Sequence, residues 1–130
     1  MCHTIGIVLR QKYRFHGHGS LRYLYKNGTA VRSRLFTLKF VANPRRPHPR
    51  YGVVVSKKTL KSAVGRNRIR RRVYEVLREQ LPLIDPTYDM VIIVASSEVA
   101  IMPAPELREA LLEMFSRADL YKKPPQSDIV

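Results

Sequence analysis

The chain has 130 residues, a length typical of one domain with a single modest hydrophobic core. Apolar residues make up 45% of it, which excludes the apolar-poor composition of a disordered chain. The 24 Lys and Arg residues outnumber the 10 Asp and Glu residues and give a formal net charge of +14, so we expect a polyanionic partner.

The charge is divided unequally along the chain. No acidic residue precedes Glu75, so residues 1–74 carry a net charge of +19 and the remaining residues carry −5. A solvated surface normally mixes both signs, so this segregation favours binding to nucleic acid, with an acidic membrane surface as the alternative. We expect a cytoplasmic protein without a membrane anchor, because Cys2 is the only cysteine and the apolar residues 5–9 are too few for a span. A transit peptide is a further alternative for the acid-free start.

The chain opens with an irregular segment and a short helix. Residues 1–19 contain three glycines and three histidines without a lasting periodicity, and we expect an irregular N-terminal arm there. Ser20 is the expected cap of a first helix in which Leu24 and Tyr25 lie on one face. Gly28 is expected to end this helix in the left-handed conformation.

Strands are predicted next, with a possible first one at residues 29–34. Residues 35–42 alternate apolar with polar side chains, which predicts a half-buried strand, and the apolar ones are Phe36, Leu38 and Phe40. Residues 43–50 hold three prolines and three arginines and are expected to form a loop. Residues 51–56 are mostly β-branched or aromatic, so we expect a strand there that pairs with the preceding one in antiparallel fashion.

The second half of the chain predicts two helices that flank a buried strand. Residues 62–81 have an apolar side at helical spacing and end before Pro82. Residues 88–95 form a continuous apolar run, as in a central strand. A closing helix begins near Pro105, and residues 121–130 are expected to be a flexible tail. We therefore predict one α+β domain over residues 1–130, with a single mixed sheet of about four strands, helices packed on one side, and the order αβββαβα.

Eight cations occur within sixteen residues where the second strand gives way to the long helix. They are Lys57, Lys58, Lys61, Arg66, Arg68, Arg70, Arg71 and Arg72. On a helix, Arg68, Arg71 and Arg72 are neighbours, and such like-charge pairs cost a few tenths of a kcal/mol each (about 0.2–0.5). Phosphate contact would reverse this cost, and Asn67 adds an amide that hydrogen-bonds a base edge or a phosphate. A surface amide is the alternative reading for Asn67.

This segment closely resembles the signature of the protein subunit of bacterial ribonuclease P. A strand that ends in Val-Ser-Lys-Lys is followed at short range by Ala-Val-Gly-Arg-Asn-Arg-Ile-Arg-Arg, and the resemblance extends over residues 20–123. It implies a left-handed crossover around the arginine helix, against the usual right-handed rule. Residues 59–62 depart from the family pattern, since this loop is one residue longer and lacks glycine.

The resemblance implies that an RNA subunit cleaves the 5′ leader from precursor tRNA with magnesium ions, while the protein has no catalytic residue and assists binding. The magnesium would be held mainly by RNA and substrate, and the partners would be the catalytic RNA and precursor tRNA, with no membrane and no obligate protein partner. The RNA-binding residues would be the eight cations and Asn67. A cleft between the first helix and the sheet would take the leader, and its expected residues are Tyr25, Phe36, Tyr51 and Val53. Burial of these side chains in the core is the alternative.

Two other classes of function compete with this interpretation. A ribosomal protein or general RNA chaperone would share the basicity without the particular Ala-Val-Gly-Arg-Asn-Arg context. A protein-only nuclease needs clustered carboxylates for metal ions, and Asp85 and Asp89 are the nearest pair, although their position beside Pro86 favours a turn. A zinc site is conceivable by ligand type alone, from Cys2, His3, His16 and His18.

Overall fold

The computed structural model describes residues 19–42, 50–85 and 87–122. Its main elements follow the predicted order αβββαβα, and they are α2 (Gly19–Asn27), β1 (Thr29–Arg32), β2 (Phe36–Ala42), β3 (Tyr51–Val55), α3 (Ala63–Gln80), β4 (Tyr88–Val94) and α4 (Ala104–Arg117). Two short 3-10 helices, η2 (Leu81–Leu83) and η3 (Ser97–Ala100), are additions that the periodicity did not predict. No helix within the described ranges is both long enough and apolar enough to cross a membrane.

The four strands form one mixed sheet in the order β1-β2-β4-β3. β2 pairs with β1 and β4 in antiparallel fashion, whereas β3 pairs with β4 in parallel. The expected antiparallel pairing of β2 with β3 is therefore wrong. The cause is β4, whose residues Met90, Val91 and Ile92 are buried on both faces of the sheet, so this strand takes the place between them. α3 makes the crossover between the parallel strands β3 and β4, and its left-handed sense stays a prediction from the resemblance.

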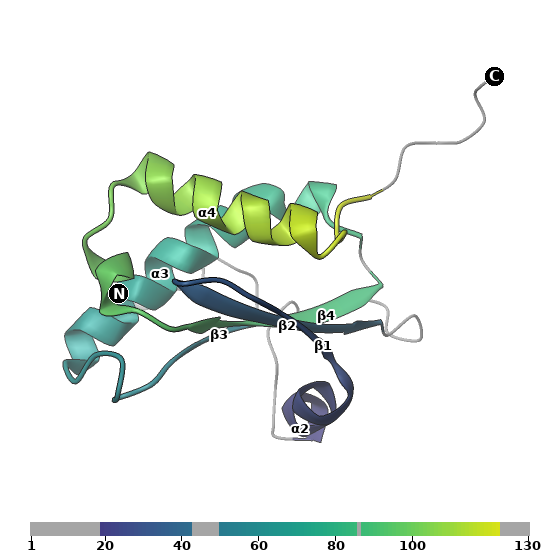
Figure 1. Cartoon of the computed structure of the whole chain (residues 1–130), viewed down its shortest axis with the longest axis horizontal. Helices are drawn as coiled ribbons and strands as arrows, with labels where there is room; N and C mark the ends of the chain where they lie inside the picture. Colours follow the sequence, from purple (N-terminus) through teal and green to yellow (C-terminus); the bar gives the residue numbers. More distant parts are fainter. Residues whose placement is uncertain (1–18, 43–49, 86, 123–130) are drawn as a thin grey trace.

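The helices lie in two layers around the sheet. α3 and α4 cover one face, as expected, and the core between them and the sheet includes Phe36, Ile69 and Leu111. α2 lies against the opposite face, so the expectation of helices on one side holds only for the two longer helices (Figure 1). Leu24 of α2 is fully buried at this second contact, so α2 covers part of the opposite face of the sheet.

The ends of the elements have identifiable local causes. Ser62 caps α3 by accepting a hydrogen bond from the Gly65 amide at 3.1 Å. Gly28 follows α2, but its φ is not in the left-handed region that we expected. Glycine is required at this position because there is no room for a side chain: a Cβ would lie 2.5 Å from the Leu24 carbonyl oxygen. Tyr121, which we expected in the tail, forms a bridge with Ile84, and residues 123–130 of the expected tail lie outside the described residues.

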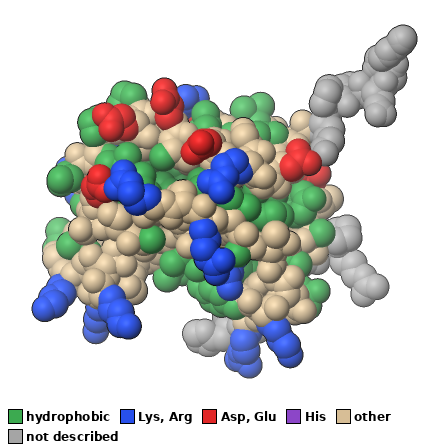
Figure 2. Space-filling view, in the orientation of Figure 1, with side chains coloured by type: hydrophobic (Ala, Val, Ile, Leu, Met, Phe, Trp, Pro, Cys, Tyr) green, Lys and Arg blue, Asp and Glu red, His purple; other side chains and the backbone are tan. Residues whose placement is uncertain are grey.

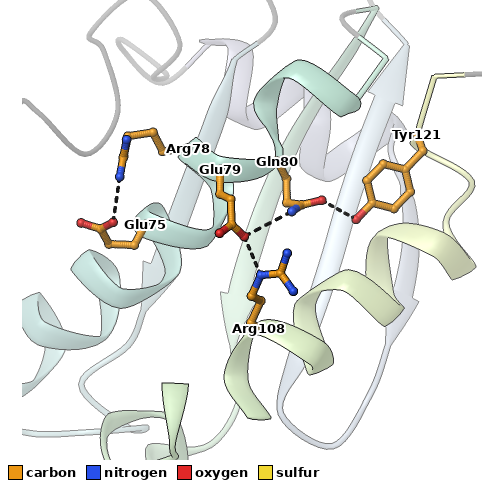
Figure 3. A network of polar contacts seen from close by, with 6 residues as sticks. All are labelled: Glu75, Arg78, Glu79, Gln80, Arg108 and Tyr121. Atoms are coloured by element: carbon orange, nitrogen blue, oxygen red, sulfur yellow. Dashed lines mark hydrogen bonds and ion pairs between the residues drawn. The ribbon is translucent and has the colours of Figure 1, made fainter. Parts of the chain in front are cut away.

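A polar network joins the end of α3 to α4 and to the segment after α4 (Figure 3). Arg108 Nε donates to Glu79 Oε1 at 2.6 Å, and Tyr121 Oη donates to Gln80 Oε1 at 2.8 Å. The hydrogen bond from Arg108 holds the pKa of Glu79 below its ordinary value, while burial raises the pKa of Tyr121. The network thus joins the C-terminal end of α3 to α4 and to Tyr121. It lies at the other end of α3 from Arg66 and Arg68.

Candidate nucleic-acid interface

Five of the eight predicted cations are exposed and have no hydrogen bond or ion pair to another described residue. We call them the cationic face, and they are Lys57, Lys58, Lys61, Arg68 and Arg71. The three lysines belong to the loop between β3 and α3, and the two arginines belong to the first half of α3. Arg68 and Arg71 are three residues apart and are therefore neighbours on the helix surface.

The other three cations are engaged in contacts within the protein. Arg66 donates to main-chain carbonyls in the loop before α3. Arg70 donates to the Asn67 side-chain oxygen at 2.6 Å. Arg72 donates to the carbonyl oxygens of Val99, at 2.7 Å, and Met102. The expectation that Arg72 stands with Arg68 and Arg71 on one open face is therefore corrected, because its side chain turns toward η3.

Among charged side chains, one edge of the molecule carries only basic ones on the face that Figure 2 draws. In Figure 2 the acidic side chains lie in the upper half of the molecule, where Lys and Arg side chains also occur, whereas the charged side chains that project from the lower edge are all Lys or Arg. Ion pairs among the described residues join arginines to carboxylates outside the cationic face, and they are Arg34 with Glu98, Arg78 with Glu75 and Arg108 with Glu79. The cationic face keeps its full charge for an anionic partner.

The structure does not bring the four expected leader-cleft residues together. Phe36, Tyr51 and Val53 are 0%, 1% and 7% exposed and belong to the core beneath α3 and α4. Tyr25 is 39% exposed and lies on α2, on the opposite side of the sheet. Successive strand residues point to opposite faces, so Phe36 and Leu38 share the core side and cannot also face α2. The strand residues that lie on the same side of the sheet as Tyr25 are therefore those that alternate with the core-facing ones.

Those alternate positions form a second surface beside α2, which we call the Tyr25 face and define as Tyr25, Thr37, Lys39, Val54 and Ile93. Thr37 and Val54 both pair with Ile93, so the three half-buried side chains form a row across the sheet. Lys39 Nζ lies 5.1 Å from the centre of the Tyr25 ring and donates to the Tyr25 carbonyl oxygen at 3.4 Å. Burial raises the pKa of the Tyr25 hydroxyl.

Lys39 was not among the candidate residues predicted from the sequence, although the sequence held the signal for its placement on this side of the sheet. It occupies a polar position in the alternating pattern of residues 36–42, the side that the pattern turns away from the core. Residues that face a binding partner across a half-buried strand come from this polar set. The aromatic residues in the apolar set, such as Phe36, are needed for packing.

The carboxylates considered for a metal site have structural roles. Asp85 accepts hydrogen bonds from the amide and hydroxyl of Thr87, as the turn interpretation expected. Asp89 is buried and accepts a hydrogen bond from the Arg50 amide at 2.8 Å. Over the three described ranges, no group of three or more His, Cys, Asp or Glu residues could hold a metal ion. The conceivable zinc ligands Cys2, His3, His16 and His18 lie outside the described residues.

Comparison with known proteins agrees with the sequence signature. The family model for ribonuclease P matches residues 9–119. The chain is 35% identical over 115 residues to the ribonuclease P protein component of Geobacillus sp. (strain WCH70), which covers 88% of this chain and 97% of that protein. It is similar to the solved RNase P protein of Staphylococcus aureus (TM-score 0.75, 26% identity, covering 85% and 98% of the two chains). It is also similar to that of Thermotoga maritima (TM-score 0.71, 27% identity, covering 80% and 96%).

Proposed function

Since this chain belongs to the protein-component family of ribonuclease P, a tRNA-processing endoribonuclease, we propose that it binds RNA through two separate surfaces. The cationic face binds the catalytic RNA subunit near the site of cleavage. The Tyr25 face, on the far side of the sheet from the core, binds the single-stranded 5′ leader of precursor tRNA. The two surfaces would let one small protein contact enzyme RNA and substrate together.

The observation that carries the first part is the division of the arginines on α3. Arg68 and Arg71 are exposed without a protein partner, whereas Arg66 and Arg72 bind main-chain carbonyls that hold the helix in place. Arg68 and Arg71 therefore lie on a helix whose position is fixed by the contacts of Arg66 and Arg72. Phosphates that they neutralise release counterions, and this release is the main source of affinity in such complexes.

The second part rests on the chemistry of the Tyr25 face. A partly exposed ring can stack on an unpaired base, and Lys39 beside it supplies a positive charge for the adjoining phosphate. Thr37, Val54 and Ile93 extend the surface with mostly apolar contacts. A surface with a partly exposed ring, apolar side chains and a positive charge suits a single strand of variable sequence, as a leader is, because every base has a face that stacks.

We assign the bond cleavage to the RNA subunit and the magnesium ions mainly to RNA and substrate. The assignment is supported by the structural roles of four acidic residues. Asp85 and Asp89 accept backbone hydrogen bonds, and Glu79 and Glu98 are paired with arginines. The protein contributes binding and orientation, which need no ionisable group of its own at the scissile bond.

The test is reconstitution with the catalytic RNA and a precursor tRNA at limiting magnesium. We expect the protein to increase the cleavage rate and to lower the magnesium concentration needed for half-maximal cleavage. A structured RNA of equal length without a cleavage site controls for general binding, which a ribosomal protein or RNA chaperone would show equally. Cleavage that is the same with and without the protein would refute the proposal.

A further inference from the structure

The loop between β3 and α3 carries three members of the cationic face and is folded back on itself. The Thr59 and Leu60 amides both donate to the Ser56 carbonyl oxygen, at 3.1 and 3.2 Å. The Ser56 hydroxyl also accepts from the Thr59 amide at 3.2 Å. Lys57 and Lys58 lie within this turn and Lys61 follows it, so the conformation of the loop decides where the three ammonium groups are presented.

Arg66 joins this loop to the first turn of α3. One terminal nitrogen of its guanidinium donates to two successive carbonyl oxygens, that of Leu60 at 2.9 Å and that of Lys61 at 2.7 Å. The side chain is half-buried, unlike those of Arg68 and Arg71. A charged donor shared between two carbonyls makes stronger hydrogen bonds than a neutral one, so the loop is held at the point where it enters the helix.

A second contact from the same helical turn reinforces the first. Leu60 is packed against the core, and its Cδ2 atom lies 2.6 Å from where a Cβ on Gly65 would be. Gly65 therefore leaves room for the Leu60 side chain while its neighbour Arg66 binds the Leu60 carbonyl.

We infer that Arg66 is a positioning residue, which holds the loop of Lys57, Lys58 and Lys61 in its binding conformation. Arg66 itself does not contact a phosphate of the RNA. The inference rests on the proposed RNA-binding role of the cationic face. Its physical basis is preorganisation, because a loop that is already ordered loses less conformational freedom when RNA binds. Without Arg66 the three lysines would keep their charge but lose their fixed placement.

The first experiment is a double-mutant cycle read out as affinity for the catalytic RNA of ribonuclease P. Arg66→Met keeps most of the aliphatic stem and removes the donors, and the loop variant replaces Lys57, Lys58 and Lys61 by alanine. We expect Arg66→Met alone to weaken binding by roughly tenfold, and to add nothing to the loss in the loop variant. Arg68→Met is the matched control, and its loss should add in full. Additive losses for Arg66→Met would show that Arg66 contacts RNA directly and would overturn the inference.

The second experiment uses the free protein and is independent of RNA. Amide hydrogen exchange at Thr59 and Leu60 reports the turn, and we expect it to accelerate in Arg66→Met but not in Arg68→Met. Exchange elsewhere in the sheet should stay unchanged, which separates loss of the loop from loss of the fold. Unchanged exchange at Thr59 and Leu60 would overturn the inference, whereas failure of the wild-type protein to bind the RNA would refute only the proposed function.

Discussion

The guanidinium of Arg72 donates a hydrogen bond to the carbonyl oxygen of Val99 at 2.7 Å and so joins the middle of α3 to η3. A second bond from the same group reaches the Met102 carbonyl, just before α4 begins. One arginine of the basic run therefore links α3 to η3 and to the segment that precedes α4. Its neighbour Arg71 has no such contact and is exposed, so adjacent arginines differ in what their removal should do.

Arg72→Ala should destabilise the protein, because two carbonyl oxygens lose a charged donor. The expected decrease in the free energy of unfolding is about 1–3 kcal/mol, measured by urea denaturation. The salt dependence of RNA binding should stay the same at temperatures where the variant is folded. Arg71→Ala is the control and should leave the urea midpoint nearly unchanged. Equal stability of the two variants would mean that the contacts to Val99 and Met102 contribute nothing.

Arg68→Ala and Arg71→Ala should each weaken binding to the catalytic RNA. If each side chain neutralises one phosphate, the slope of log affinity against log salt should fall by roughly 0.7–0.9 per variant. Arg78→Ala removes the same charge from the last turn of α3, where Arg78 is paired with Glu75, and should leave the slope unchanged. A slope that changes equally in all three variants would indicate a general effect of net charge and not a specific face.

Tyr25→Ala should weaken binding of precursor tRNA more than binding of mature tRNA, because only the precursor has a leader to stack on the ring. A lost base–aromatic stack is worth about 1–3 kcal/mol, measured as the ratio of the two affinities in the presence of the catalytic RNA. Tyr25→Phe keeps the ring and should restore the ratio. A loss that is the same for both tRNAs would place the leader somewhere other than the Tyr25 face.

The fold could be predicted largely from sequence because its signals are local. Periodicity located the long helix and the apolar run of β4, and Ser62 and Pro82 marked where α3 begins and ends. The pairing of strands was not predictable in the same way. The insertion of β4 between β2 and β3 depends on which strand gains most from burial on both faces, and that is a property of the whole sheet.

For the candidate site too, the sequence predicted the local features and not the contacts between distant segments. The basic run identified which residues carry charge, but nothing in it showed that Arg66 and Arg72 are bound to carbonyls while Arg68 and Arg71 are not. That depends on where loops distant in sequence lie. The leader residues were misplaced for a different reason. The strand alternation already assigned Phe36 to the core side, and the set of residues taken from the family resemblance did not follow that alternation.

The last prediction concerns Glu79 and the stability of the protein at acid pH. The hydrogen bond from Arg108 lowers the pKa of this carboxyl below its ordinary value of 4.5. The folded protein therefore holds the carboxylate more strongly than the unfolded chain does. The resulting stabilisation is fully present above pH 4.5 and is lost as the pH falls through the lower folded-state pKa.

In Arg108→Gln the pKa of Glu79 should rise toward 4.5, and the stability should depend less on pH in the acid range. The pKa can be followed by NMR titration of the Glu79 side chain, and the stability by urea midpoints from about pH 7 to about pH 3. Because the pair is exposed, the change in stability should be small and should shrink further with added salt. An unchanged pKa of Glu79 in the variant would show that the contact with Arg108 is not maintained in solution.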